Sequence, residues 1–161
     1  MKKGFTMIEL IFVIVILGVL ASVAIPRLAA TRDDAEVAKA ATNLTTAVSD
    51  ITAYYTAKGK FTSSVQTDFT QITNALTKDG KLNVKGTTTC VEVKLPDTTK
   101  QQASGAVELE LNFKKNADPV CKQLAKLPGI KTMCKVDTTN ATNEVPDTCK
   151  IQIGGSGGIQ F

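Results

Sequence analysis

The chain has 161 residues, about the length of one ordinary domain, so a multi-domain enzyme with a separate cofactor module is not expected. Its 43% hydrophobic and 21% charged residues are typical of a folded protein, and a formal net charge of +4 does not by itself indicate a nucleic-acid partner. The sequence contains no histidine, which excludes imidazole bases, histidine-containing triads and nearly every common zinc or haem site. No glycine-rich phosphate loop precedes a helix and no nucleophile has a visible base, so we do not expect an enzyme.

An apolar stretch near the N-terminus predicts a helix long enough to cross a membrane. Between Lys3 and Arg27 the only charged side chain is Glu9. About twenty such residues, at ~1.5 Å each, span a ~30 Å hydrocarbon core. Because Lys2 and Lys3 precede the stretch, the positive-inside rule places the N-terminus in the cytoplasm and the residues after Arg27 outside.

Three interpretations of this segment are open. The first is a cleaved secretory signal, with Ser22-Val23-Ala24 as its small-residue cleavage site. The second is an ordinary signal anchor. The third starts from Gly4-Phe5-Thr6-Met7-Ile8-Glu9, because a carboxylate costs about 2.5–3.5 kcal/mol near the centre of a membrane helix and needs a cationic partner.

A cut after Gly4 would give Glu9 such a partner. Phe5 would then carry a new α-amino group four residues before the carboxylate, near the helix start where negative charge is favoured. The amine and the carboxylate could pair within one chain or between staggered neighbours, where a buried polar pair would fix the register. The alternative is an acid near a helix end whose side chain extends to the membrane interface.

At these residues the sequence resembles the prepilins of type IV pili and the pseudopilins of type II secretion systems. The matching residues are Lys2-Lys3-Gly4 followed by Phe5-Thr6-Met7-Ile8-Glu9-Leu10, and the similarity continues to Pro26. The resemblance implies that a prepilin peptidase cuts between Gly4 and Phe5 and that Phe5 is then N-methylated. It also implies that Glu9 supports methylation and filament registration.

The resemblance further implies two locations and a set of partners. The chain would be a single-pass protein of the bacterial inner membrane, with a cytoplasmic N-terminus and a periplasmic head, that later enters a periplasmic or cell-surface filament. The implied partners are membrane lipid before assembly, copies of the chain in a helical filament, an inner-membrane assembly platform, and minor pilins or pseudopilins. The rival function is a secreted, disulfide-stapled binding domain released by ordinary signal peptidase after Ala24.

Beyond the apolar stretch the pattern predicts an amphipathic helix. Its apolar residues recur at alternating spacings of four and three and share one stripe: Val37, Ala41, Leu44, Val48, Ile51 and Tyr55. We predict a cleaved leader over residues 1–4, one helix over 5–58 and a globular head over 59–161. The helix has a membrane or filament-core half (5–28) and an amphipathic half (29–58), and at roughly 80 Å it is too long for one small domain to cover. Lipid or other copies of the chain must cover its first half.

Gly18 and Pro26 lie inside this predicted helix. Proline removes a helix hydrogen bond, and glycine weakens a helix by ~1 kcal/mol relative to alanine. In the family that the sequence resembles, this stretch loses helicity when subunits pack into a filament, and the matching residues permit the same here. A simple proline kink is the alternative.

The remaining pattern makes the fold class α+β and pilin-like: a long N-terminal helix packed against a small antiparallel sheet. We predict a helix over Val65–Lys78 and another that starts at Asp118-Pro119 and ends at Pro128-Gly129. Three alternating segments predict strands. Their apolar faces can cover the helix stripe, while charged side chains point outward. The apolar faces are formed by Val91, Val93 and Leu95, by Val107, Leu109, Leu111 and Phe113, and by Ile151 and Ile153. The outward side chains are Lys94, Glu108, Glu110 and Lys150.

Four cysteines, Cys90, Cys121, Cys134 and Cys149, lie on the exported side and predict two disulfides. Three connectivities are possible. We favour Cys121 with Cys134, which flank the short helix, and Cys90 with Cys149, which start two strands. A four-thiolate metal site is the alternative, disfavoured because CxxC pairs are absent.

No cofactor is expected, although the 137–147 loop offers oxygen ligands of the kind that calcium takes. Their spacing matches no calcium-binding loop, so a solvated turn is favoured. The resemblance keeps calcium as an alternative, because major pseudopilins often hold calcium in a C-terminal loop. The oxygen ligands are Asp137, Asn140, Asn143, Glu144 and Asp147.

Overall fold

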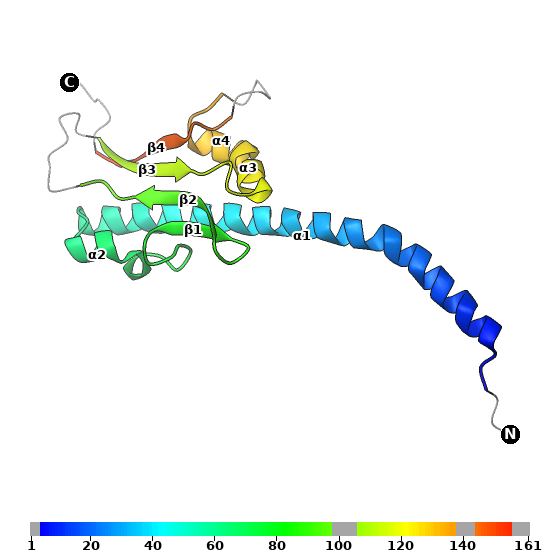
Figure 1. Cartoon of the computed structure of the whole chain (residues 1–161). Coiled ribbons are helices and arrows are strands. Elements are labelled where there is room, and N and C mark those ends of the chain that lie inside the picture. The colour runs from blue at the N-terminus through cyan, green and yellow to red at the C-terminus, as the bar shows by residue number, and fades with distance from the viewer. Residues whose placement is uncertain (1–3, 98–105, 138–143, 156–161) are drawn as a thin grey trace. The chain divides into compact units, whose positions relative to one another are not determined.

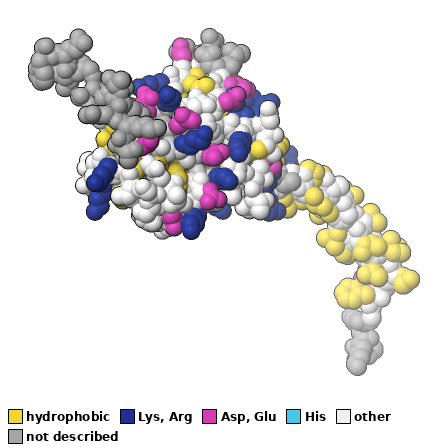
Figure 2. All heavy atoms as spheres, turned by 60° about the vertical axis from the view of Figure 1, so that its left-hand side comes forward, with side chains coloured by type: hydrophobic (Ala, Val, Ile, Leu, Met, Phe, Trp, Pro, Cys, Tyr) yellow, Lys and Arg dark blue, Asp and Glu magenta, His cyan; other side chains and the backbone are white. Residues whose placement is uncertain are grey.

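Helix α1 runs from Met7 to Lys58 and enters both compact units of the chain, Met1–Ala35 and Glu36–Phe161 (Figure 1). The computed structural model describes residues 4–97, 106–137 and 144–155, except for the side chain of Ala29. In the first unit, every described side chain from Gly4 to Leu28 is exposed. Figure 2 shows these hydrophobic side chains gathered on the N-terminal part of the helix.

In the second unit, α1 buries a stripe against the sheet. The fully buried positions alternate by three and four residues, and they are Val37, Ala40, Leu44, Ala47 and Ile51. Three members of the predicted stripe are among them, whereas Ala41, Val48 and Tyr55 are only partly buried. The stripe that faces the core is therefore rotated slightly toward the two alanines, Ala40 and Ala47.

The sheet has four antiparallel strands in the order β1-β2-β3-β4, formed by Lys81–Val84, Thr88–Lys94, Val107–Phe113 and Thr148–Gly154. The α+β class and all three predicted strands are confirmed. The outward-facing charges form cross-strand ion pairs, between Lys94 and Glu110 at 3.9 Å and between Lys150 and Glu108 at 3.7 Å. Strand β1 was not predicted, and a turn at Lys85 and Gly86, both with positive φ, joins it to β2.

The predicted helix over Val65–Lys78 is wrong. The structure has a short helix α2 at Ser63–Thr67 and a 3₁₀ turn η1 at Phe69–Gln71. The break falls at Asp68, whose backbone is extended. Its side chain accepts a hydrogen bond from the Thr70 amide, and this bond takes the place of a helix hydrogen bond. Gly80 then turns the chain into β1 with φ of +73°, close against the Phe69 ring.

Helix α3, Pro119–Lys126, starts where predicted. The Asp118 carboxylate accepts the Val120 amide at 2.8 Å, and this bond, with the Lys85 ammonium 3.2 Å away, lowers the pKa of Asp118. Pro128-Gly129, however, does not end the helical region as expected. It begins a further helix α4, Pro128–Met133, because proline after an extended Leu127 suits the first position of a helix.

All four cysteines form disulfides, as predicted, but the favoured pairing is wrong. Cys90 on β2 bonds to Cys121 on α3, and Cys134 just after α4 bonds to Cys149 on β4, with Cα–Cα distances of 5.0 and 5.5 Å. Cys121 and Cys134 do not pair with each other: Cys121 lies within α3, α4 separates it from Cys134 along the chain, and each cysteine bonds to a different strand. Each bond therefore fixes one short helix to the sheet.

The end of β4 lies against the end of α1. The Phe61 ring stacks on Tyr54 and Tyr55, with centroids 5.9 and 5.6 Å away. Gly154 approaches Tyr55 so closely that a Cβ atom there would lie 2.2 Å from a ring carbon. A side chain at this position would have to displace the aromatic cluster.

We expect Gly154→Ala to lower the stability of the head by about 1–3 kcal/mol, because the Tyr55 ring must move. Thermal unfolding of the full chain in detergent, followed by circular dichroism, measures the change. Gly129→Ala is the matched control, since its Cβ would meet nothing within 4 Å and its melting temperature should not fall. Equal melting temperatures for both variants would contradict the close packing at Gly154.

We expect a thiol-alkylating reagent to modify none of the four cysteines without reductant. Mass spectrometry of a non-reduced tryptic digest should then find one peptide pair linked through Cys90 and Cys121 and another through Cys134 and Cys149. Lysines between Cys121 and Cys134 separate these two cysteines into different peptides, so each pairing is distinguishable. A Cys121–Cys134 link would contradict the structure.

Candidate assembly site at the N-terminus

The N-terminal part of α1 presents an apolar surface that its own chain does not cover. The large hydrophobic side chains from Phe5 to Leu28 are between 43% and 92% exposed. Within the described residues, α1 is the helix long and apolar enough to cross a membrane, by length and composition. A signal sequence satisfies the same criterion, so the details at the start of the helix must separate the interpretations.

Those details are reciprocal hydrogen bonds between Thr6 and Glu9. The backbone amide and the hydroxyl of Thr6 both donate to Glu9 Oε2 at 2.8 Å, and the Glu9 amide donates to Thr6 Oγ1 at 3.4 Å. This is a capping box, in which a threonine before the helix and an acid three residues later satisfy amides that have no partner in the helix. The carboxylate is therefore held at the first turn of α1.

The capping box offsets only part of the cost of placing a carboxylate in lipid. A negative charge at a helix N-terminus is stabilised by about 0.3–1 kcal/mol, whereas an acid deep in a membrane helix costs about 2.5–3.5 kcal/mol. The Thr6 hydrogen bonds satisfy one carboxylate oxygen of Glu9 but bring no positive charge to it. A cation near the start of α1 would complete its neutralisation.

The predicted cleavage bond lies just outside the helix. Gly4 and Phe5 are both exposed and precede Met7, the first helical residue. A Cβ atom at Gly4 would meet nothing within 4 Å, so neighbouring atoms leave the bond open to a protease. The two lysines of the motif, Lys2 and Lys3, lie outside the described residues.

Gly18 and Pro26 both lie within α1, which is helical at each of them. Pro26 has no amide hydrogen to donate to the Ser22 carbonyl, so the helix carries one bond fewer there. Loss of helicity on assembly stays a prediction.

The sequence motif predicted roles for Gly4, Phe5 and Glu9. The role of Thr6, which holds the Glu9 carboxylate by two hydrogen bonds, was not predicted. The signal was present in the sequence, because Thr6-Met7-Ile8-Glu9 has the threonine-x-x-glutamate spacing of a capping box. Thr6 orients the carboxylate, since two of its donors converge on one carboxylate oxygen.

The calcium hypothesis for the 137–147 loop is not tested. Asn140 and Asn143 lie outside the described residues. Among its described acids, Asp147 pairs with Lys115 at 2.9 Å and Glu144 with Lys126 at 3.7 Å. No group of three or more acids, cysteines or histidines in the described part of the chain could hold a metal ion.

Comparison with protein families matches residues 1–25 to the prokaryotic N-terminal methylation motif. This is the prepilin-type signature of type IV pilins and pseudopilins. Neither the curated proteins nor the solved structures gave a match to the chain.

The motif and the exposed apolar helix together support a type IV pilin-like subunit. The motif is of the kind that prepilin peptidase processes in subunits that assemble into filaments, and it favours a structural protein. With the apolar helix, it also fits a membrane-anchored chain.

Proposed function

We propose that the chain is a structural subunit of an extracytoplasmic filament, either a type IV pilus or a type II secretion pseudopilus. The observation that carries the proposal is an uncovered apolar helix that starts at Met7, within the methylation motif matched over residues 1–25. Lipid covers this helix while the subunit is stored in the inner membrane with its head in the periplasm. Neighbouring helices cover it after assembly.

Between the two filaments we favour the pilus. The head carries two disulfides, and the second closes a loop near the C-terminus between Cys134 and Cys149. The family resemblance associates such C-terminal disulfides with pilins more than with major secretion pseudopilins. An assembly platform in the inner membrane and minor subunits are the partners that this function requires.

In this function Glu9 neutralises the amine of a neighbouring subunit. After cleavage, the Phe5 amine lies one residue before Thr6, next to the capping box that holds the carboxylate. Two staggered helices could therefore meet through the Phe5 amine of one and Glu9 of the other. The Thr6 bonds orient the acceptor for that contact.

We expect the mature chain to begin with N-methyl-Phe5, because the peptidase cuts after Gly4. Intact-mass measurement and sequencing of the N-terminal peptide check this. Gly4→Val is the control, and we expect it not to be cleaved. A Cβ atom at position 4 would meet nothing within 4 Å, so the loss of cleavage would reflect the peptidase's requirement for glycine before the bond and not a change in the fold. A mature chain that begins at Ile25 would contradict the filament function and support the secreted domain.

We expect Glu9→Gln to leave the chain processed and abundant in the membrane but to reduce sheared filaments at least about tenfold. Glutamine can still accept the Thr6 bonds and inserts more easily into lipid, but it strands the neighbouring amine, at a cost of several kcal/mol. Quantitative immunoblots of membrane and filament fractions measure both effects.

Asp34→Asn is the matched control for that variant, because it removes an exposed negative charge from the same helix outside the apolar segment. Its filaments should form at the normal level. Normal filament yield from Glu9→Gln itself would show that the carboxylate only extends to the membrane interface.

A further inference from the structure

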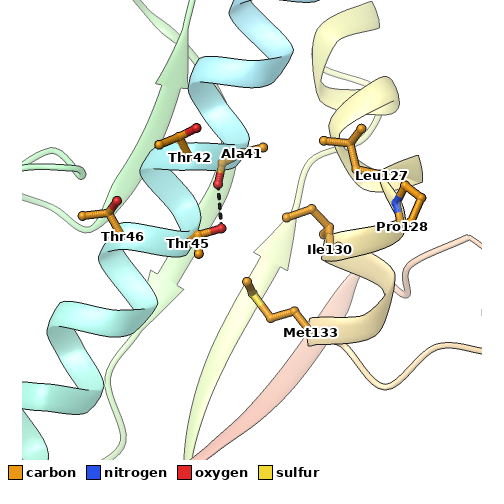
Figure 3. Close-up of a pocket in the computed structure, with 9 residues that line it drawn as sticks. Ala41, Thr42, Thr45, Thr46, Leu127, Pro128, Ile130 and Met133 are labelled. Atoms are coloured by element: carbon orange, nitrogen blue, oxygen red, sulfur yellow. Dashed lines mark hydrogen bonds between the residues drawn. The ribbon is translucent and has the colours of Figure 1, made fainter.

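The head carries an apolar groove that is separate from the exposed N-terminal segment. The groove lies between α1 and α4 within the second unit and has a volume of about 570 Å³ (Figure 3). Ala41, Thr42 and Thr45 form its wall on α1. Leu127, Ile130 and Met133 form the opposite wall, and Figure 3 shows their side chains pointing toward α1.

Two of the three threonine hydroxyls along the groove already have hydrogen-bond partners within α1. The Thr42 hydroxyl donates to the Ala38 carbonyl at 3.0 Å, and the Thr45 hydroxyl donates to the Ala41 carbonyl at 2.9 Å. Because these donors are used within α1, an occupant that excludes water would leave them paired. None of the nine residues that line the groove is charged. The surface therefore suits an uncharged, apolar occupant, and none of its lining side chains is a cation that could pair with a phosphate or an acidic peptide.

The chain itself supplies a partner with this chemistry. Its residues 5–28 expose a dense set of aliphatic and aromatic side chains, with Glu9 and Arg27 as the only charges. A row of such side chains on a helix fits a groove between two other helices, as ridges fit grooves. The occupant must come from another copy, because a helix cannot turn back onto a groove that its own residues 41–46 form.

We propose that this groove receives the apolar N-terminal helix, residues 5–28, of a second copy of the chain in the filament. The inference rests on the proposed filament function and adds a surface to it. Contacts between subunits would then join a helix to a head as well as a helix to a helix.

Photo-crosslinking from Gly129 tests the contact. Gly129 lines the groove, has no positive φ, and its Cβ would meet nothing within 4 Å, so benzoylphenylalanine can replace it without displacing neighbours. The variant is co-expressed as a minor component with the unmodified chain, so that filaments form. After irradiation of sheared filaments, we expect a crosslink to the tryptic peptide Phe5–Arg27 of a second copy.

Benzoylphenylalanine at Thr132 is the matched control, because this exposed residue lies on the same helix outside the groove. Its yield of the same crosslink should be at most about one-tenth of that from position 129. If the variant at 129 does not enter filaments, the same measurement from Thr46, on the α1 side of the groove, decides the question.

Several outcomes would overturn the groove assignment while leaving the filament function in place. They are crosslinks from assembled subunits to residues 36–161 of a neighbour, to lipid or to another protein, or no crosslink at all. Failure of the unmodified chain to form filaments would instead contradict the proposed function.

Discussion

The structure depends on one constraint: α1 carries an apolar surface that its own chain leaves uncovered. Sixteen large hydrophobic side chains among the described residues are exposed between Phe5 and Leu28. Covering a side chain of this kind stabilises by about 1.5–3 kcal/mol, so the segment as a whole represents on the order of a few tens of kcal/mol. That exceeds the roughly 5–15 kcal/mol that holds a typical domain together. In the proposed function, whether lipid or other subunits cover this surface therefore determines where the chain resides.

Because no described side chain of the first unit belongs to the core, the second unit must be stable by itself. Its core is formed by one stripe of α1 and one face of the sheet, and cross-strand ion pairs line the outer face. Helices α3 and α4 are only 8 and 6 residues long, too short to persist alone in water. The two disulfides attach them to β2 and β4. The same bonds fix one wall of the apolar groove, so the covalent links in the head also shape a surface available to neighbours.

The sequence predicted the parts of the fold that have strong periodicity. The long helix, the three longer strands and the cap at Asp118 were all recognisable, because apolar alternation and capping residues act over a few neighbouring positions. The misses depend on distant contacts. The disulfide pairing joins each short helix to a strand distant in sequence, and the break at Asp68 is accompanied by close approach of the Phe69 ring to Gly80. Strand β1 is only four residues long, too short for alternation to identify it.

At the candidate site, Gly4, Phe5 and Glu9 were predicted from a local motif, and Thr6 was overlooked although its spacing to Glu9 was visible.

A polar residue inside an otherwise apolar surface can fix the position of one helix along another, which hydrophobic burial cannot do. Burial is non-directional, and two apolar helices displaced by one turn along each other still cover most of the same area. A filament of identical subunits needs one offset rather than several. The Thr6 bonds hold the Glu9 carboxylate in a defined position at the first turn of α1. An amine from a neighbour that must meet that carboxylate in a medium without water has one low-energy position, since any other leaves two buried charges unpaired. In the proposed filament the apolar surface would therefore supply the strength of association, and the single acid would supply its register.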